Sequence, residues 1–209
     1  MYGTQENGIR IGIVSDLNDP LRLGRVRVTY PTLDDQQSTW ARLATLMAGP
    51  SRGSVFVPEV EDEVLIAFEE GDPRRPYVIG ALWSTVDPPP PTDGQIPQNN
   101  WRFFKSRCGH IIKFDDTPGA EKIEILDKDN AHKIIIDSPK QKIQVLCDTG
   151  DVEVSAASGT VKVDALNIEM QATQKVTIQA ATVEIKATTT MNVEAGAAMT
   201  IKGAVVNIN

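Results

Sequence analysis

Apolar and polar residues alternate in a short repeat unit that runs from Ile123 to the end of the chain. Each copy is an apolar–x–apolar triplet followed by a polar turn, and successive copies start seven to eleven residues apart. Alternation with a period of two predicts β-strands whose apolar side chains share one face. The triplets are residues 123–125, 134–136, 143–145, 152–154, 161–163, 168–170, 176–178, 183–185, 191–193, 199–201 and 206–208.

These strands have to stack, because one copy buries only two or three side chains and is not stable alone. The strands are short and a turn follows each at once. This favours three identical chains wound around one axis over a single-chain β-solenoid with longer rungs. The regular spacing argues against a low-complexity tail. The sequence therefore predicts a triple-stranded intertwined β-helix in a homotrimer, with these residues in its core: Val176, Ile178, Val183, Ile185, Val193 and Ile201.

The amino-acid composition of the repeat region agrees with a narrow β-helix. No aromatic residue occurs after Phe114, and a thin core has no room for rings. No proline occurs after Pro139, as expected where each backbone N–H joins a β-ladder.

Five apolar stretches bounded by turn residues precede the repeats. They predict strands at residues 10–14, 24–30, 40–47, 63–69 and 77–83, a spacing that favours a small antiparallel barrel of the OB type. Four consecutive prolines that start at Pro88 then predict an extended spacer. The predicted all-β chain has an OB-type collar domain (1–86), a Pro-rich linker (87–98), a transition segment (99–121) and a β-helix needle (122–209).

Composition narrows the function classes. The chain has 209 residues and a formal net charge of −7, which disfavours nucleic acid as the main partner because phosphate binding needs a concentrated basic surface. Two cysteines, Cys108 and Cys147, are too few for a disulfide framework. Neither a signal peptide nor a membrane-spanning segment is visible in the sequence, so we expect synthesis and assembly in the cytoplasm.

Side chains suited to catalysis or metal binding are few and poorly spaced. The two histidines, His110 and His132, lie in neither an H-x-H nor an H-x-x-x-H spacing. Cys108 and His110 would share one face of a strand, but without a third group the pair is interpreted as structural. Ser51 and Ser54 lack the strand–turn–helix context of a nucleophile elbow. No catalytic residue, cofactor or metal ligand is predicted.

Charged residues also cluster in predicted turns. Asp and Asn at positions 115–116 and 127–130 have the chemistry to hold a cation, but both are ordinary turn formers, and the turn interpretation is preferred. Arg74 and Arg75 stand between two prolines. They are interpreted as a solvated hairpin tip, with inter-subunit contact or hub docking as the lesser alternative.

Several spaced motifs resemble the spike proteins of contractile injection machines. This family includes the phage baseplate protein V type, the T4-type cell-puncturing spike and the VgrG proteins of type VI secretion. The motifs occur in the family's order, ahead of the expected repeat, and the match covers nearly the whole chain. They are GRVRVTYP at 24–31, WAR at 40–42, VPEVEDEVLIAF at 57–68, GDPRRPYVIG at 71–80 and GHIIKFDD at 109–116.

The resemblance implies a trimer in which three OB barrels form a collar and three C-terminal segments intertwine into a needle. It implies a separate hub protein, because the first predicted strand starts about ten residues from Met1. The linker stands where the T4-type spike carries a lysozyme domain, so cell-wall hydrolysis is not expected. No histidine follows His132, which implies a separate metal-carrying tip protein of the PAAR type, with effector cargo, on a C-terminal platform. The platform residues are Val205, Val206, Asn207, Ile208 and Asn209.

The predicted function is mechanical and non-enzymatic: the central spike of a phage tail or phage-tail-like injection system, which pierces the target envelope with transient membrane contact. Two alternatives stay open. A trimeric β-helical tail enzyme acting on surface polysaccharide is opposed by short outward residues of mixed sign. An OB-fold nucleic-acid-binding protein is opposed by the acidic charge and by the lack of spaced stacking residues.

Overall fold

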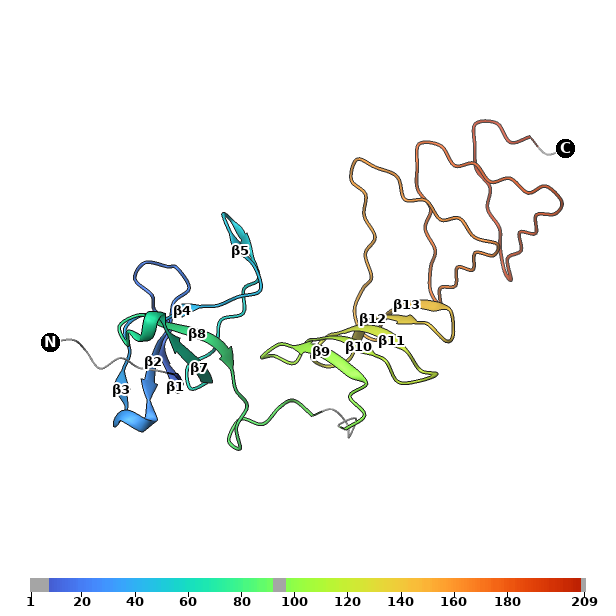
Figure 1. The fold of residues 1–209 in the computed structure, drawn as a ribbon. Helices are drawn as coiled ribbons and strands as arrows, with labels where there is room; N and C mark the ends of the chain where they lie inside the picture. Colours follow the sequence, from blue (N-terminus) through green and yellow to red (C-terminus); the bar gives the residue numbers. More distant parts are fainter. Residues whose placement is uncertain (1–7, 92–96, 208–209) are drawn as a thin grey trace. The chain divides into compact units, whose positions relative to one another are not determined.

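The computed structural model of the protein describes residues 8–91 and 97–207, which are almost entirely β or irregular (Figure 1). Helical structure in these ranges is limited to two 3-10 turns, η1 (Pro31–Leu33) and η2 (Glu69–Gly71). The chain divides after Val152 into two units, which we describe separately. Within the described residues the structure contains no helix that could span a bilayer.

The N-terminal sheet closes on itself as an OB-type barrel. Its strand order is β3-β2-β1-β7-β8-β4, with β4 parallel to β8 and the other pairs antiparallel. A bridge between Val26 and Ala41, with N–H···O distances of 3.0 and 2.7 Å, joins the two sides. The strands are β1 (Ile9–Asp16), β2 (Arg27–Tyr30), β3 (Gln36–Gln37), β4 (Arg42–Leu43), β7 (Glu63–Phe68) and β8 (Pro76–Ala81).

Alternate residues of these strands point into the barrel and form its core. Val14, Val28, Val64 and Ile66 are completely buried, and each occupies an every-second-residue position on its strand. Gly12 lies against this core: a Cβ there would come within 2.9 Å of Val28 Cγ2. Period-two alternation is therefore sufficient to fill the barrel from within one chain.

Four of the five strands predicted for the barrel are confirmed, and the fifth is much shorter than expected. The strand predicted at 40–47 contains regular structure only at β4, because the chain leaves the sheet after Leu43. It continues into a hairpin of β5 (Ala48–Gly49) and β6 (Arg52–Gly53), which the sequence did not predict.

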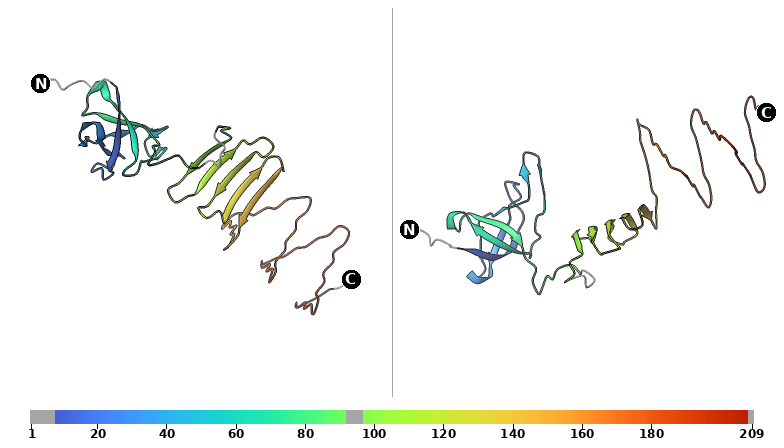
Figure 2. Two further views of the ribbon diagram at one scale, coloured as in Figure 1. Left: turned by 90° about the horizontal axis from the view of Figure 1, so that it is seen from below. Right: turned by 45° about the vertical axis from the view of Figure 1, so that its right-hand side comes forward.

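The second sheet of the first unit is an antiparallel meander in sequence order. Figure 2 (left) shows its five strands side by side. The first three apolar triplets are confirmed as strands, at β11, β12 and β13, and they pair with one another inside one chain. The strands are β9 (Trp101–Lys105), β10 (Ile111–Asp115), β11 (Lys122–Leu126), β12 (His132–Asp137) and β13 (Lys142–Cys147).

The second unit, described for residues 153–207, is a series of extended segments separated by bends (Figures 1 and 2). The bends lie at 157–159, 166, 173–174, 181, 188–189, 196–197 and 204, so they recur every seven or eight residues. From 161–163 onward, each apolar triplet falls between two bends or follows the last one. Within the described part of this unit no strand pairs with another and every residue is exposed.

We predict that Ile66→Ala destabilises the barrel by about 2–5 kcal/mol, because it leaves a cavity in a fully buried site. Urea unfolding followed by tryptophan fluorescence measures the loss. Ile79→Ala removes the same atoms from a side chain that is 46% exposed and serves as the control. Equal losses at the two positions would contradict the assignment of the core.

Candidate functional site

One face of the β9–β13 sheet is apolar and exposed. Adjacent strands place apolar residues directly opposite one another: Ile125 pairs with Ile134, and Ile134 with Val145. These side chains are between 39% and 71% exposed in the single chain. A continuous apolar patch of this kind marks an interaction surface. We call it the apolar sheet face; it consists of Phe104, Ile112, Phe114, Ile123, Ile125, Ile134, Ile136, Ile143 and Val145.

The opposite face of the same sheet carries its paired charges, and we call it the polar face, although half-buried Ile111, Leu126 and Ile135 also lie on it. Asp115, Lys122, Asp137 and Lys142 follow one another across four strands, so that each carboxylate has a lysine opposite it. The Lys140 ammonium, 2.9 Å from Asp137, holds the pKa of that carboxyl below its usual range. Cross-strand pairs of opposite charge stabilise a sheet, so this face carries stabilising charge pairs within one chain.

Lys113 adds a second charged contact to the polar face. Its ammonium forms an ion pair with Glu124 on the next strand and lies 4.2 Å from the centre of the Trp101 ring. The two faces of one sheet thus differ: the polar face combines paired charges with half-buried apolar residues, and the other face is mainly apolar and exposed.

The predicted core residues of the needle are exposed in the single chain. Each of the six, from Val176 to Ile201, is between 52% and 69% exposed. In the predicted tip platform, Val205 is 76% and Val206 is 48% exposed, and Asn207 is exposed too. Ile208 and Asn209 lie outside the described residues. The core and platform roles stay predictions.

A groove of about 670 Å³ lies on the barrel, beside the loop before β2, strand β4, the β5–β6 hairpin and the turn between β7 and β8. We call it the arginine groove, because guanidinium groups dominate its charged lining. Glu69 is the acidic residue among its lining. The groove's charged and aromatic residues are Arg25, Arg42, Arg74, Arg75, Trp40, Tyr77, Phe56 and Glu69.

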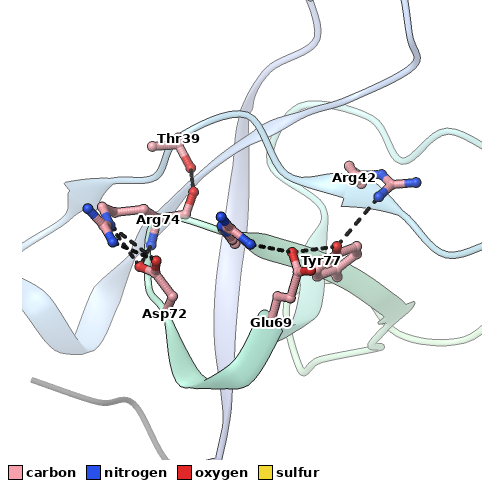
Figure 3. Close-up of polar contacts among 7 residues, drawn as sticks. Thr39, Arg42, Glu69, Asp72, Arg74 and Tyr77 are labelled. Carbon is pink, nitrogen blue, oxygen red and sulfur yellow. Dashed lines mark hydrogen bonds and ion pairs between the residues drawn. The ribbon is translucent and has the colours of Figure 1, made fainter. Parts of the chain in front are cut away.

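The turn that forms one wall of the groove is held by ion pairs (Figure 3). Arg74 donates from Nε and Nη2 to the two carboxylate oxygens of Asp72, at 2.9 and 2.8 Å. This pairing lowers the pKa of Asp72 to about 2. Thr39 donates to the carbonyl oxygen of Arg74 at 2.9 Å, which ties the turn to the segment before β4. The predicted hairpin tip is exposed, as expected, but its arginines are ordered by partners.

A second group of contacts continues along the groove. Glu69 accepts a hydrogen bond from the Tyr77 hydroxyl at 2.9 Å and lies 3.6 Å from Arg75. Arg42 lies over the Tyr77 ring, 5.4 Å from its centre, and its Nη1 is 3.5 Å from the hydroxyl. Within the described residues Arg42 forms no ion pair, so it is a free positive charge on the groove.

The other end of the groove is fixed by Asp19, which is only 8% exposed. Its carboxylate lies 2.6 Å from Arg25 and also accepts the backbone N–H groups of Leu21 and Leu23, which keeps its pKa well below the usual range. Arg25 in turn lies 5.8 Å from the centre of the Trp40 ring. The groove therefore presents guanidinium groups stacked on rings, in a rigid arrangement.

His132 forms a clamp at the end of the meander. Its Nδ1 is 2.8 Å from Asp127 and its Nε2 is 2.7 Å from the carbonyl oxygen of Thr149. Both ring nitrogens therefore face acceptors, which favours the imidazolium form. The hydrogen bond with Asp127 raises the pKa of His132, and the same bond lowers the pKa of Asp127 to about 2.

Comparison with known proteins finds a family that matches the barrel. The type VI secretion system/phage-baseplate injector OB domain family matches residues 10–83. The barrel is thus similar to an injector OB domain. The type VI secretion system spike proteins VgrG4b and VgrG5 of Pseudomonas aeruginosa are 35% and 32% identical to the chain over 114 and 121 residues. The predicted resemblance to spike proteins is confirmed.

The matched stretches are 49% and 54% of this chain, and 14% of each Pseudomonas protein. The actin cross-linking toxin VgrG1 of Vibrio cholerae is 27% identical over 111 residues, which are 48% of this chain and 10% of the toxin. The chain therefore matches a minor part of the length of these relatives.

Outside the injector OB domain, the structure corrects one prediction about candidate chemistry. Cys108 and His110 do not lie on one strand face, because residues 106–110 form the turn between β9 and β10. No group of three or more His, Cys, Asp or Glu side chains that could hold a metal occurs among the described residues. Of the two acidic clusters, Asp115 ends β10, and Asp127 binds the backbone of its own turn.

Sequence reasoning missed the clamp and the ion pairs of the groove. Asp127 and His132 are five residues apart, an i, i+5 spacing typical of a hairpin turn, which was the available signal. Arg42 and Tyr77 are 35 residues apart and meet only because β4 and β8 are parallel neighbours.

We predict that the clamp is strongest between about pH 4 and pH 6.5. Above this window its contribution is lost as the pH rises through the raised pKa of His132, and below it as the pH falls toward the lowered pKa of Asp127. NMR titration of His132, assigned with a His110→Gln variant, should show a pKa above 6.5 that falls in Asp127→Asn. Asp129→Asn, in the same turn, is the control. An equal change in both variants would contradict the clamp.

Proposed function

We propose that the protein is the central spike of a phage tail or phage-tail-like contractile injection system, and that it works as a homotrimer. One observation carries the proposal: an injector OB domain is followed by exposed apolar triplets at regular spacing. The named spike relatives support the same role.

Burial of the apolar sheet face supplies the driving force for assembly. Full burial of one such side chain contributes roughly 1.5–3 kcal/mol relative to full exposure, so half-exposed residues contribute roughly 1 kcal/mol each. Three copies that turn these faces toward a common axis bury them all, with the polar faces outward. The extended segments of the second unit then pair between copies, because each lacks a partner in its own chain.

A shaft of this construction suits a mechanical task. Backbone hydrogen bonds form continuous ladders along its length, and three chains share the compressive load when the sheath contracts. The spike joins the tube and a separate hub protein to the tip, and it meets the target envelope first. This role requires no catalytic group and no cofactor.

The tip carries a second proposed contact. Val205 and Val206 belong to the last repeat, and their exposed side chains present an apolar surface at that level of the shaft. A PAAR-type tip protein, with or without effector cargo, would cover this surface and the strand edges beside it.

We predict that the purified protein has three times the mass of its 22.8 kDa chain in light scattering. Ile178→Asp or Ile185→Asp should abolish the trimer, because three carboxylates would meet in a dry core at a cost of several kcal/mol each.

The matched controls are Thr177→Asp and Glu184→Lys, which change the charge of the neighbouring outward positions and should leave the trimer intact. A monomeric wild-type protein would overturn the proposed function. Equal tolerance at both sets of positions would overturn the inside–outside assignment.

We further predict that Val206→Asp prevents capture of a PAAR-type protein by the spike, because a charge replaces part of the apolar surface. Pull-down with the purified tip protein measures this, and light scattering checks that the trimer is retained. Lys202→Gln, a nearby change at an exposed polar position, should leave capture unchanged. Retention of the tip protein by a trimeric Val206→Asp variant would exclude this surface.

A further inference from the structure

A rigid acidic turn precedes β7 in the barrel. Residues 59–62, which we call the acidic turn, are fixed to β1 because Glu61 N–H donates to the Val14 carbonyl oxygen and Val14 N–H donates to that of Asp62, both at 2.9 Å. The Asp62 carboxylate also accepts the Glu59 N–H at 2.8 Å. Glu61 adopts a φ of 78°, an uncommon value for a residue with a side chain. The backbone is thus held in a strained conformation that fixes the position of this side chain.

One carboxylate of the acidic turn is available for a partner. Glu59 is paired with Arg107 at 3.0 Å, and Asp62 is used inside the turn. Glu61 is exposed and forms no ion pair within the described residues. Val57 and Val60, which flank the charges, are 43% and 46% exposed. The segment therefore alternates apolar and acidic groups on a preformed backbone.

The arginine groove has the complementary chemistry. Arg42 is its free positive charge, and Arg75 is only loosely paired, 3.6 Å from Glu69. Leu23 and Val55 give the groove an exposed apolar rim, at 70% and 82% exposure. Because guanidinium groups lie over the Trp40 and Tyr77 rings, the groove presents positive charge where a nucleic-acid binder presents free rings. The arginine groove therefore suits a ligand that presents a carboxylate next to apolar side chains.

Glu61 lies far from Arg42 of its own chain, although Val57, which precedes the acidic turn, lines the groove. Arg42 is level with Tyr77, which pairs with Ala67 near the end of β7, whereas Glu61 precedes the start of that strand. Six residues of extended chain separate the two levels, about 20 Å. Two complementary patches at different places on one chain make a head-to-tail contact, which closes into a ring when the rotation fits.

We propose that the acidic turn of one copy docks into the arginine groove of the next, with Glu61 against Arg42, and that three such contacts close the collar. This inference rests on the proposed trimer and adds to it the surface by which the injector OB domains meet. Both surfaces are rigid before they meet, so the contact requires little reordering of either.

Cross-linking of the full chain tests the contact. In a Cys108→Ser, Cys147→Ser background, Val60→Cys and Arg75→Cys place one thiol on each surface while Glu61 and Arg42 stay in place. A cross-link within one chain leaves a monomer band on a denaturing gel, so only contacts between copies give larger products. The double variant should therefore give covalent dimers and trimers on denaturing gels, and either single variant should stay monomeric.

Charge reversal then tests the pairing. Adding Glu61→Arg should slow cross-linking by about tenfold, and adding Arg42→Glu as well should restore it, because the pair is rebuilt with opposite polarity. Asp35→Arg, the same charge change on another exposed turn, should have no effect. Light scattering on each variant records the oligomeric state.

The outcomes separate the two proposals. Trimers that do not cross-link, or that cross-link equally with Glu61→Arg, overturn the collar contact and leave the spike role standing. A protein that is monomeric throughout overturns both.

Discussion

The structure depends on apolar surface that a single chain cannot bury. One face of the β9–β13 strands and the outer positions of the later triplets are mainly Ile, Val, Met and Phe, yet these side chains keep roughly half of their area in contact with water. The hydrophobic effect makes this arrangement unfavourable for an isolated molecule. The charges of the same sheet, by contrast, are paired across strands. One face of the sheet therefore carries charge pairs within the chain, whereas the other exposes apolar side chains that favour association.

The same period-two pattern has a different outcome in the barrel. There the strands curve and close through the parallel β4–β8 pair and the Val26–Ala41 bridge, so that Val14, Val28 and Ile66 bury one another. Closure removes the sheet edges and the need for a partner. One chain therefore combines a self-sufficient domain, which can carry defined surface features such as the arginine groove, with a region whose apolar side chains are exposed in the single chain.

Local patterning predicted most of the strands, because alternation and turn residues are local properties. It failed where pairing is long-range. The strand predicted at 40–47 ends at Leu43. Its ordered part, β4, is held by its parallel neighbour β8, and no residue near β4 in the sequence indicates that pairing. The hairpin of β5 and β6 has too few apolar residues to give a pattern. The candidate surfaces were predicted in part: the triplet residues follow from the repeat, whereas the contacts of Arg42 and His132 require knowing which strands are neighbours.

The clamp at His132 has a consequence for alignment along the shaft. In the proposed trimer, near-equal repeats of seven or eight residues would give three intertwining chains many almost equivalent ways to slide past one another. The meander has no such degeneracy, because its strands are fixed by turns within one chain. By holding the carbonyl oxygen of Thr149, His132 ties the start of β12 to the segment that follows β13 and leads into the later triplets. In the proposed trimer, this sheet would set the register of the later repeats, so that the three chains pair in phase.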